Sequence, residues 1–172
     1  MNPDLDFVFA RRSVRAYCDQ PVPEACIRDL LEAAMAAPSA VCKDPWHFVV
    51  LREQRTRQLV AECLPNGKML GQAPLGFVIC GDTQAAHDGE LSYLLQDCSA
   101  AVENLLLAAA ALGLGACWLG VHPRADRIRN VSEILNLPDH ILPIAAVAMG
   151  WPTQAPSPRT RFREEAVHNE CW

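Results

Sequence analysis

Apolar residues recur along the chain at two spacings, which predict helices alternating with buried strands. A helix is expected to begin at Pro23, whose missing N–H would have no partner there, and to end near Ala37, because Pro38 disfavours helical geometry before it. Further helices are expected over 53–64, 90–112 and 124–135. Short, continuously apolar runs predict buried strands over 48–51, 75–80, 116–121 and 144–149. This alternation indicates an α+β or α/β pattern.

The longest expected helix, over 90–112, carries a wide apolar face that suits a core or a subunit interface. Gly113 is a plausible C-cap, because glycine tolerates the left-handed conformation. The uncharged stretch 105–121 barely reaches the length of a membrane span, and Gly113 and Gly115 interrupt it. A buried helix followed by a buried strand therefore fits better than a membrane span.

Length and composition indicate one globular domain covering residues 1–172. The chain is 51% hydrophobic and 20% charged, with no internal repeat or linker that would divide it. After Pro152 the chain becomes a basic, aromatic-ended tail over about 152–172. Such a segment cannot fill a core alone, so it is expected either to wrap a neighbouring subunit or to fray.

Net charge and cysteine content indicate which partners and which cellular compartment to expect. A net charge of −5 argues against nucleic acid as a partner. The first nine residues carry two aspartates and no basic region, so no secretory signal is visible. Eight cysteines form neither a C-x-x-C motif nor a zinc-finger spacing, which favours reduced, buried thiols and no metal site. These features together predict a cytoplasmic protein.

Two short segments could bind a flat, phosphorylated ligand. Arg11, Arg12, Ser13 and Arg15 offer three guanidiniums and a hydroxyl within five residues, which suits a phosphate monoester. From composition alone, a solvated basic run is the commoner explanation. Pro38, Ser39 and Ala40 follow a helix, and their small size would let the backbone approach a flat ligand. The plain alternative there is a loop that ends a helix.

The glycine-rich segment 113–120 resembles a dinucleotide-binding motif only superficially. Trp118 stands where the third glycine would fall, and the segment follows a helix and enters a strand. A Rossmann site is excluded on both grounds. What remains is a helix-to-strand turn whose end presents the backbone amides of Leu119 and Gly120.

Arg161 and Arg163 alternate in the tail, so in an extended segment they share one face and one of them could reach a phosphate. The alternative is a charged tail in solvent. The chain contains no G-x-S-x-G, H-E-x-x-H or Walker sequence, and its five histidines are scattered. The reactivity is therefore expected to come from a cofactor, with no catalytic side chain.

Taken in order, these features resemble the nitroreductase family. That family shows R-x-S-x-R near the start, A-P-S after the first long helix, and then P-W-x-F, here 45–48. An A-P pair before a strand follows, here 73–74, and then G-L-G-x-x-W-x-G, here 113–120. A late strand ending at Gly150 precedes a basic segment. The resemblance spans nearly the whole chain and is closest to the compact members of the family.

The resemblance implies an FMN-binding α+β fold with a central mixed β-sheet flanked by helices, in an intertwined homodimer with two sites at the subunit interface. The helix over 90–112 would form much of that interface. Carried over by position, the residues expected at the phosphate and ribityl chain are Arg11, Arg12, Ser13 and Arg15, with Arg161, or else Arg163, also at the phosphate. The residues expected at the isoalloxazine from the second subunit are Pro38, Ser39 and Ala40. The residues expected along the ring, with a backbone amide near N5 or O4, are Trp118, Leu119 and Gly120.

Two positions depart from the family pattern. Where the family often reads N-x-Q-P-W, this chain has Cys42 and Asp44 in place of the two amides. The FMN expectation stands, but the acceptor specificity is left open. A carboxylate near a reduced, anionic flavin would be unfavourable unless it faces away.

The resemblance implies a two-step flavin cycle, in which NAD(P)H reduces FMN and a small acceptor of nitroaromatic or quinone type then reoxidises it. One alternative is a specialised flavin reaction on the same fold, such as dehalogenation, oxidation or cofactor fragmentation. Another is a flavin-binding regulator without enzymatic activity.

Overall fold

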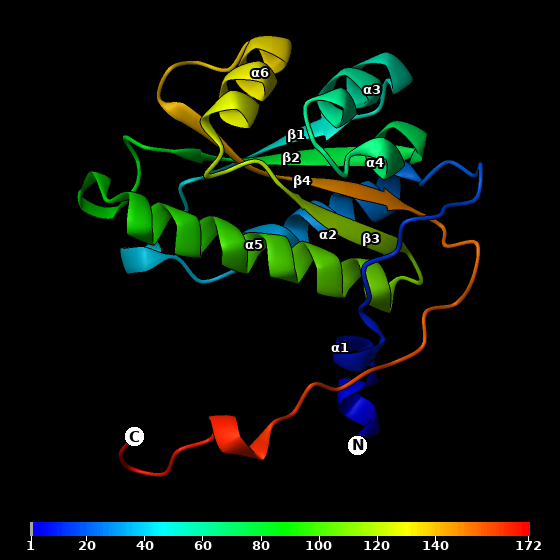
Figure 1. Ribbon diagram of the computed structural model, residues 1–172, viewed down its shortest axis with the longest axis vertical. Coiled ribbons are helices and arrows are strands. Elements are labelled where there is room, and N and C mark those ends of the chain that lie inside the picture. Colours follow the sequence, from blue (N-terminus) through cyan, green and yellow to red (C-terminus); the bar gives the residue numbers. More distant parts are fainter. Residues whose placement is uncertain (1) are drawn as a thin grey trace.

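Four strands form one sheet at the centre of the computed structural model, which describes residues 2–172 (Figure 1). They are β1 (Trp46–Leu51), β2 (Leu75–Asp82), β3 (Gly115–Gly120) and β4 (Ile141–Gly150), in the spatial order β1-β2-β4-β3. All four strands predicted from the sequence are confirmed. Three of them are longer than predicted, because ladder pairing extends past the ends of the apolar runs.

The neighbouring strands are all antiparallel, so the expectation of a mixed sheet is wrong for these four strands. The helical crossover from β2 to β3 does leave those two strands running in the same direction. However, β4 lies between them and runs opposite to both. Within residues 2–172, the one parallel pairing is an isolated bridge between Ser13 and Ala116.

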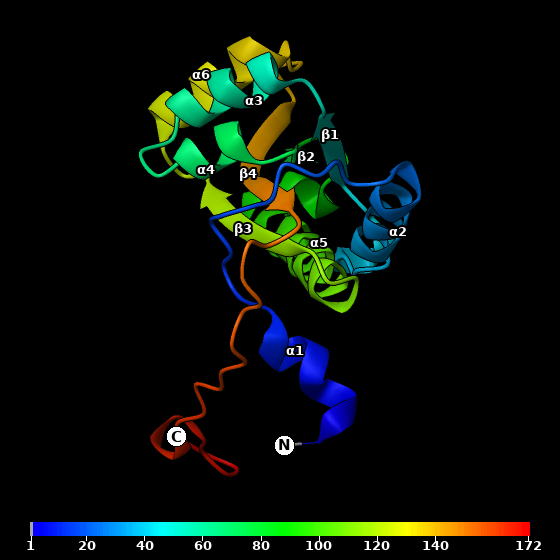
Figure 2. The ribbon, with the colours of Figure 1, turned by 90° about the vertical axis from the view of Figure 1, so that its right-hand side faces the viewer.

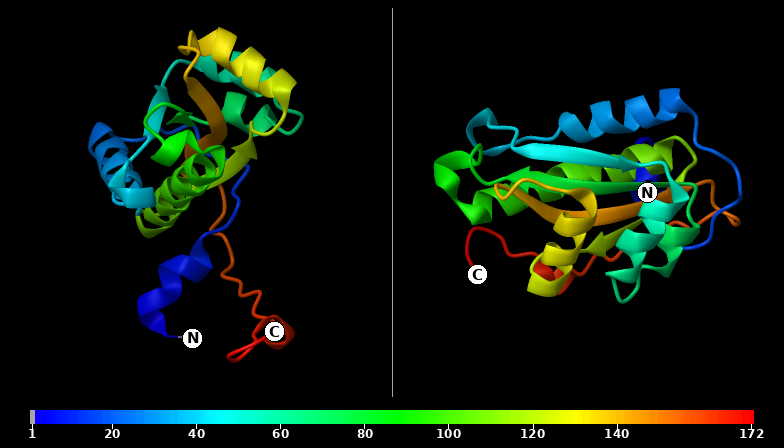
Figure 3. Two further views of the ribbon diagram at one scale, coloured as in Figure 1. Left: turned by 90° about the vertical axis from the view of Figure 1, so that its left-hand side faces the viewer. Right: turned by 90° about the horizontal axis from the view of Figure 1, so that it is seen from above.

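Helices cover both faces of the sheet (Figures 1 and 3). α2 (Glu24–Met35) and α5 (Leu91–Ala111) pack on one face, and α3 (Gln54–Glu62), α4 (Lys68–Gln72) and α6 (Ala125–Leu135) pack on the other. Side chains alternate between the two faces along β2. Phe77 and Ile79 pack in the hydrophobic core beneath α2 and α5, and Val78 and Cys80 pack in the core beneath α3, α4 and α6.

The central helix α5 matches its predicted extent to within one residue at each end. Gly113 follows it with a φ of +76°, which confirms the expected left-handed cap. Among the described helices, α5 alone has the length and hydropathy of a candidate membrane span. Its buried residues, from Leu94 to Ala109, pack against the sheet as part of the core.

Two short helices escaped the sequence analysis. α1 (Asp6–Ala10) and α4 are five residues each, too short for an apolar period to show. α1 and the C-terminal tail extend together away from the sheet (Figure 2), and the Arg159 amide donates to the Phe9 carbonyl at 3.1 Å. Both arms expose apolar side chains to solvent, including Phe7, Phe162 and Trp172.

Candidate functional site

The arginine-rich segment is fastened to the outer edge of the sheet. β3 pairs with β4 on one side only, so its other side offers unpaired backbone groups. The Val14 amide donates to the Ala116 carbonyl there at 2.9 Å, next to the bridge between Ser13 and Ala116. Arg12 and Arg15 therefore flank the two residues that attach to the edge of β3, whereas Arg11 is paired with Glu103 on α5.

The side chain of Tyr17 also holds the arginine-rich segment in place. Its hydroxyl donates to the Val14 carbonyl at 2.6 Å and also lies 3.2 Å from the Ala148 carbonyl. Burial raises the pKa of this phenol, which stays a neutral donor. The Thr153 amide donates to the Ala16 carbonyl at 3.2 Å, so the segment is held between β3 and the chain that follows β4.

Gly115 lets the segment approach β3 this closely. A Cβ at residue 115 would lie 2.7 Å from two side-chain carbons of Val14, closer than packed carbons tolerate. We therefore expect Gly115→Ala to displace Val14 and the arginines on either side of it. The variant should lose about 1–3 kcal/mol of unfolding free energy, as overpacked sites do, and should bind the expected cofactor, FMN, about tenfold more weakly. Thermal unfolding and fluorescence titration with FMN measure the two effects.

Gly71 provides the matched control for that substitution. A Cβ at residue 71 would meet its nearest neighbours at 3.4 Å or more, which is ordinary contact. Gly71→Ala should leave FMN affinity unchanged. Unaltered FMN affinity in Gly115→Ala would show that the position of the Val14 segment does not matter for the cofactor.

The three arginines differ in their partners. Arg11 Nε lies 3.3 Å from Glu103 Oε1 on α5, and burial raises the pKa of Glu103 while Arg11 opposes that rise. Arg15 donates to the Ser13 carbonyl at 3.2 Å. Within residues 2–172, neither Arg12 nor Arg15 forms an ion pair with a carboxylate. These two cations remain available to an anionic ligand.

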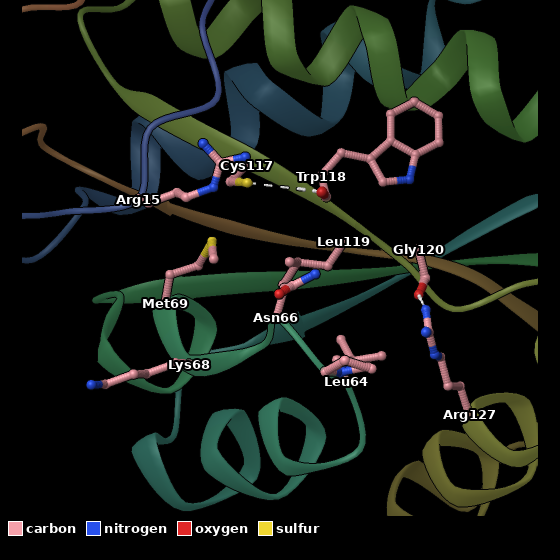
Figure 4. A pocket seen from close by; sticks show the side chains of 11 residues that line it. Arg15, Leu64, Asn66, Lys68, Met69, Cys117, Trp118, Leu119, Gly120 and Arg127 are labelled. Atoms are coloured by element: carbon pink, nitrogen blue, oxygen red, sulfur yellow. Dashed lines mark hydrogen bonds between the residues drawn. The ribbon is translucent and has the colours of Figure 1, made fainter.

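A pocket of about 530 Å³, here called the β3 pocket, opens beside Arg15 (Figure 4). Its wall comes from β3, from the connection between α3 and α4, from the first residues of α4, and from α6. The lining residues are Arg15, Leu64, Pro65, Asn66, Lys68, Met69, Cys117, Trp118, Leu119, Gly120 and Arg127. Sequence reasoning had selected four of them, namely Arg15, Trp118, Leu119 and Gly120.

The β3 pocket is positively charged. Arg15, Lys68 and Arg127 line it, and none of its described lining residues is an aspartate or glutamate. The thiol of Cys117 is buried, and this burial raises its pKa, with Arg15 opposing the rise. A cationic cleft in a chain of net charge −5 concentrates anions.

The other seven lining residues were not selected from the sequence, and they include three polar or charged side chains: Asn66, Lys68 and Arg127. A Cβ at Gly67 would lie 2.1 Å from the Ala61 carbonyl oxygen, so the tight turn that presents Asn66 and Lys68 requires glycine. The Asn66-Gly67 pair is a turn signal that could have located this loop. Arg127 carried no comparable signal, because α6 reaches the pocket only through tertiary packing.

A second concavity, here called the arginine groove, adjoins the β3 pocket and has a volume of about 410 Å³. Its lining residues are Arg12, Ser13, Val14, Arg15, Ala16, Thr153, Gln154, Ala155, Pro156 and Ser157. Arg15 lines both concavities and therefore stands between them. This arrangement provides an anion site beside a broader pocket.

The backbone of β3 also faces the ligand space. Because the Ala116 carbonyl points away from β4, strand alternation turns the backbone groups of Trp118 and Gly120 outward and those of Leu119 toward β4. The expectation that the amides of Leu119 and Gly120 are presented together is therefore corrected to Trp118 and Gly120. Leu119 lines the pocket through its side chain, whereas the Trp118 ring lies on the other side of the strand (Figure 4).

The segment Pro38–Ala40 lies apart from this site within one chain. The Ala40 amide donates to Asp97 Oδ1 on α5 at 2.9 Å, and no residue of 38–40 lines the β3 pocket. The Ser39 hydroxyl donates to Asp44 Oδ1 at 2.5 Å, so the Asp44 carboxylate is held by its own loop. Cys42 is exposed, with a left-handed φ of +53°.

Arg161 and Arg163 lie in the extended tail. The part of the tail that borders the arginine groove is Thr153–Ser157, and Arg163 Nε lies 3.9 Å from Glu165 Oε1. A return of Arg161 or Arg163 to the Arg11–Arg15 cluster does not occur within one chain. Their role at a phosphate stays a prediction for the assembled protein.

The cysteines are all free, as expected, but only part of the set is buried. Burial raises the pKa values of Cys80 and Cys98 to about 12, so these thiols stay protonated at neutral pH. Cys18, Cys42 and Cys171 are exposed. The expectation of buried thiols therefore holds for Cys80, Cys98 and Cys117 and fails for the three exposed residues.

Comparison with known proteins agrees with this geometry. The family model described as the nitroreductase family matches residues 8–66 and 54–151. A Methanothermobacter thermautotrophicus protein whose name pairs NADH dehydrogenase with NAD(P)H nitroreductase is 39% identical over 168 residues, covering 98% of this chain and 87% of its own length. A solved Parabacteroides distasonis structure with a name of the same kind has a TM-score of 0.92 and 39% identity, with both chains fully covered. A Desulfovibrio desulfuricans structure in complex with FMN has a TM-score of 0.84 and 32% identity, covering 100% of this chain and 99% of that one.

Proposed function

We propose, because this chain belongs to the nitroreductase family, that it is a cytoplasmic FMN-dependent oxidoreductase that takes electrons from NAD(P)H and passes them to a small nitroaromatic or quinone acceptor. The observation that carries the proposal is the cationic β3 pocket, joined through Arg15 to the arginine groove. Eight free cysteines support a reducing compartment.

The two concavities match the two parts of FMN. Arg12 and Ser13 in the arginine groove would hold the phosphate by charge-assisted and neutral hydrogen bonds. The β3 pocket would take the isoalloxazine, with Arg15 between the two parts. The complex of the D. desulfuricans relative with FMN supports this cofactor. When bound, FMN supplies the two-electron chemistry that no side chain of the protein provides.

The protein's own groups would tune that cofactor. The outward amide of Gly120 would donate to the ring edge at N5 or O4. Arg15, Lys68 and the amide of Asn66 would face the pyrimidine oxygens. Fixed cations and donors stabilise the negative charge that reduction places on the ring, so they favour electron transfer from NAD(P)H.

The site would be completed by a second copy of the chain in an intertwined homodimer. Pro38, Ser39 and Ala40 lie outside the β3 pocket of their own chain, so the partner's loop would supply them. The two arms expose large apolar side chains, and Phe162 is 76% exposed. Wrapping a partner would bury these side chains and could bring Arg161 to a phosphate.

The absorption spectrum of the purified protein tests the proposal. We expect flavin bands that bleach when NADH or NADPH is added without oxygen and that return when a quinone or nitroaromatic compound is added. Flavin bands that neither donor bleaches would instead support a flavin-binding regulator. A protein that stays colourless after reconstitution with FMN would overturn the proposal.

A further inference from the structure

Arg127 occupies the end of the β3 pocket that lies away from Arg15 (Figure 4). Its Nη1 donates to the carbonyl of Gly120 at 2.9 Å, which fixes the guanidinium beside the last residue of β3. Within residues 2–172, Arg127 forms no ion pair with a carboxylate. Its other N–H groups are therefore available to a ligand.

The position of Arg127 in α6 does not favour a positive charge. Arg127 lies in the first turn of α6, where the helix dipole disfavours positive charge. Arg15 and Lys68 already serve the proposed cofactor from the opposite end of the pocket. The planar fork of a guanidinium fits a carboxylate better than it fits a neutral group.

We propose that Arg127 binds an anionic substituent of the electron acceptor, so that the preferred acceptors are aromatic compounds carrying a carboxylate. This inference rests on the proposed function, because the Gly120 amide marks where the reactive edge of the flavin would lie. The anionic groups of NAD(P)H are phosphates, which ribose separates from the reacting nicotinamide ring. A compact acceptor, in contrast, can carry its charge directly on the ring that stacks beside Gly120.

The test compares 4-nitrobenzoate with nitrobenzene in the wild-type enzyme and in Arg127→Gln. Loss of charged hydrogen bonds should lower kcat/KM for 4-nitrobenzoate about 10- to 100-fold, with less than a twofold change for nitrobenzene. Arg127→Lys, which keeps the charge but not the fork, should lie between the two enzymes. Arg129→Gln is the matched control, because Arg129 is exposed on the same helix and does not line the β3 pocket.

Three outcomes would overturn the inference. Equal losses for both acceptors would show that Arg127 acts on the flavin or the fold, and no loss would show that it does not bind the acceptor. In Arg127→Gln, slower bleaching by NADPH with unchanged bleaching by NADH and unchanged acceptor turnover would show that Arg127 binds a phosphate of the electron donor instead. Failure of the proposed function is seen separately, because the wild-type protein would then lack flavin bands or would not bleach.

Discussion

Replacing Arg15 with glutamine is expected to leave the purified protein without bound FMN. Arg15 is the one arginine that lines both the arginine groove and the β3 pocket, so its guanidinium would contact the cofactor where the phosphorylated chain meets the ring. Removing a charged donor from such a position should raise the Kd for FMN on the order of 100-fold. Fluorescence titration of the apoprotein with FMN measures this change.

Arg55 supplies the control for Arg15→Gln. It is exposed on α3 and lines neither the β3 pocket nor the arginine groove. Arg55→Gln therefore makes the same change in net charge at a position outside the candidate site. The control should keep the wild-type Kd and melting temperature. If Arg15→Gln binds FMN as tightly as Arg55→Gln does, the flavin does not lie along the edge of β3.

The helices and strands that could be predicted from the sequence are those with long or continuous apolar patterns. α5 and the four strands bury whole faces, so their extents appear in the sequence. α1 and α4 are single short turns of helix whose stability comes from neighbouring segments. The strand order could not be read from local pattern, because the insertion of β4 between β2 and β3 is decided by contacts between distant residues.

The residues of the candidate site also fall into those that a local sequence motif predicts and those that only tertiary packing brings there. Arg15 and Gly120 belong to recognisable local motifs, and the structure brings both to one pocket. Lys68 and Arg127 belong to no motif, and they reach the pocket only because α4 and α6 pack beside β3. Ala40 was placed at the cofactor by resemblance, and within one chain it contacts Asp97 instead. The mixed-dimer experiment tests that placement.

Two inactive variants are expected to recover activity when their chains are combined in one dimer. Arg15→Gln would remove the cofactor contact made by one chain. Ala40→Trp would fill the flavin space from the loop of the other chain, since Ala40 lies outside the β3 pocket of its own chain. In a mixed dimer, one site would carry both changes and the other would carry neither. Purified mixed dimers should therefore hold about half of the wild-type sites, and the unsorted mixture from random pairing of equal amounts should hold about a quarter.

The two variants would be co-expressed with different affinity tags, and dimers that carry both tags would be compared with each variant alone. Flavin content and bleaching by NADH count the restored sites, and melting temperatures show that each variant folds. Purified mixed dimers that stay inactive would mean that a single chain builds the whole site. Full activity of Ala40→Trp alone would remove the loop from the flavin altogether. Recovery confined to the mixed dimer would instead explain why Pro38–Ala40 and Arg15 lie apart in one chain, since each chain would supply a different half of two sites.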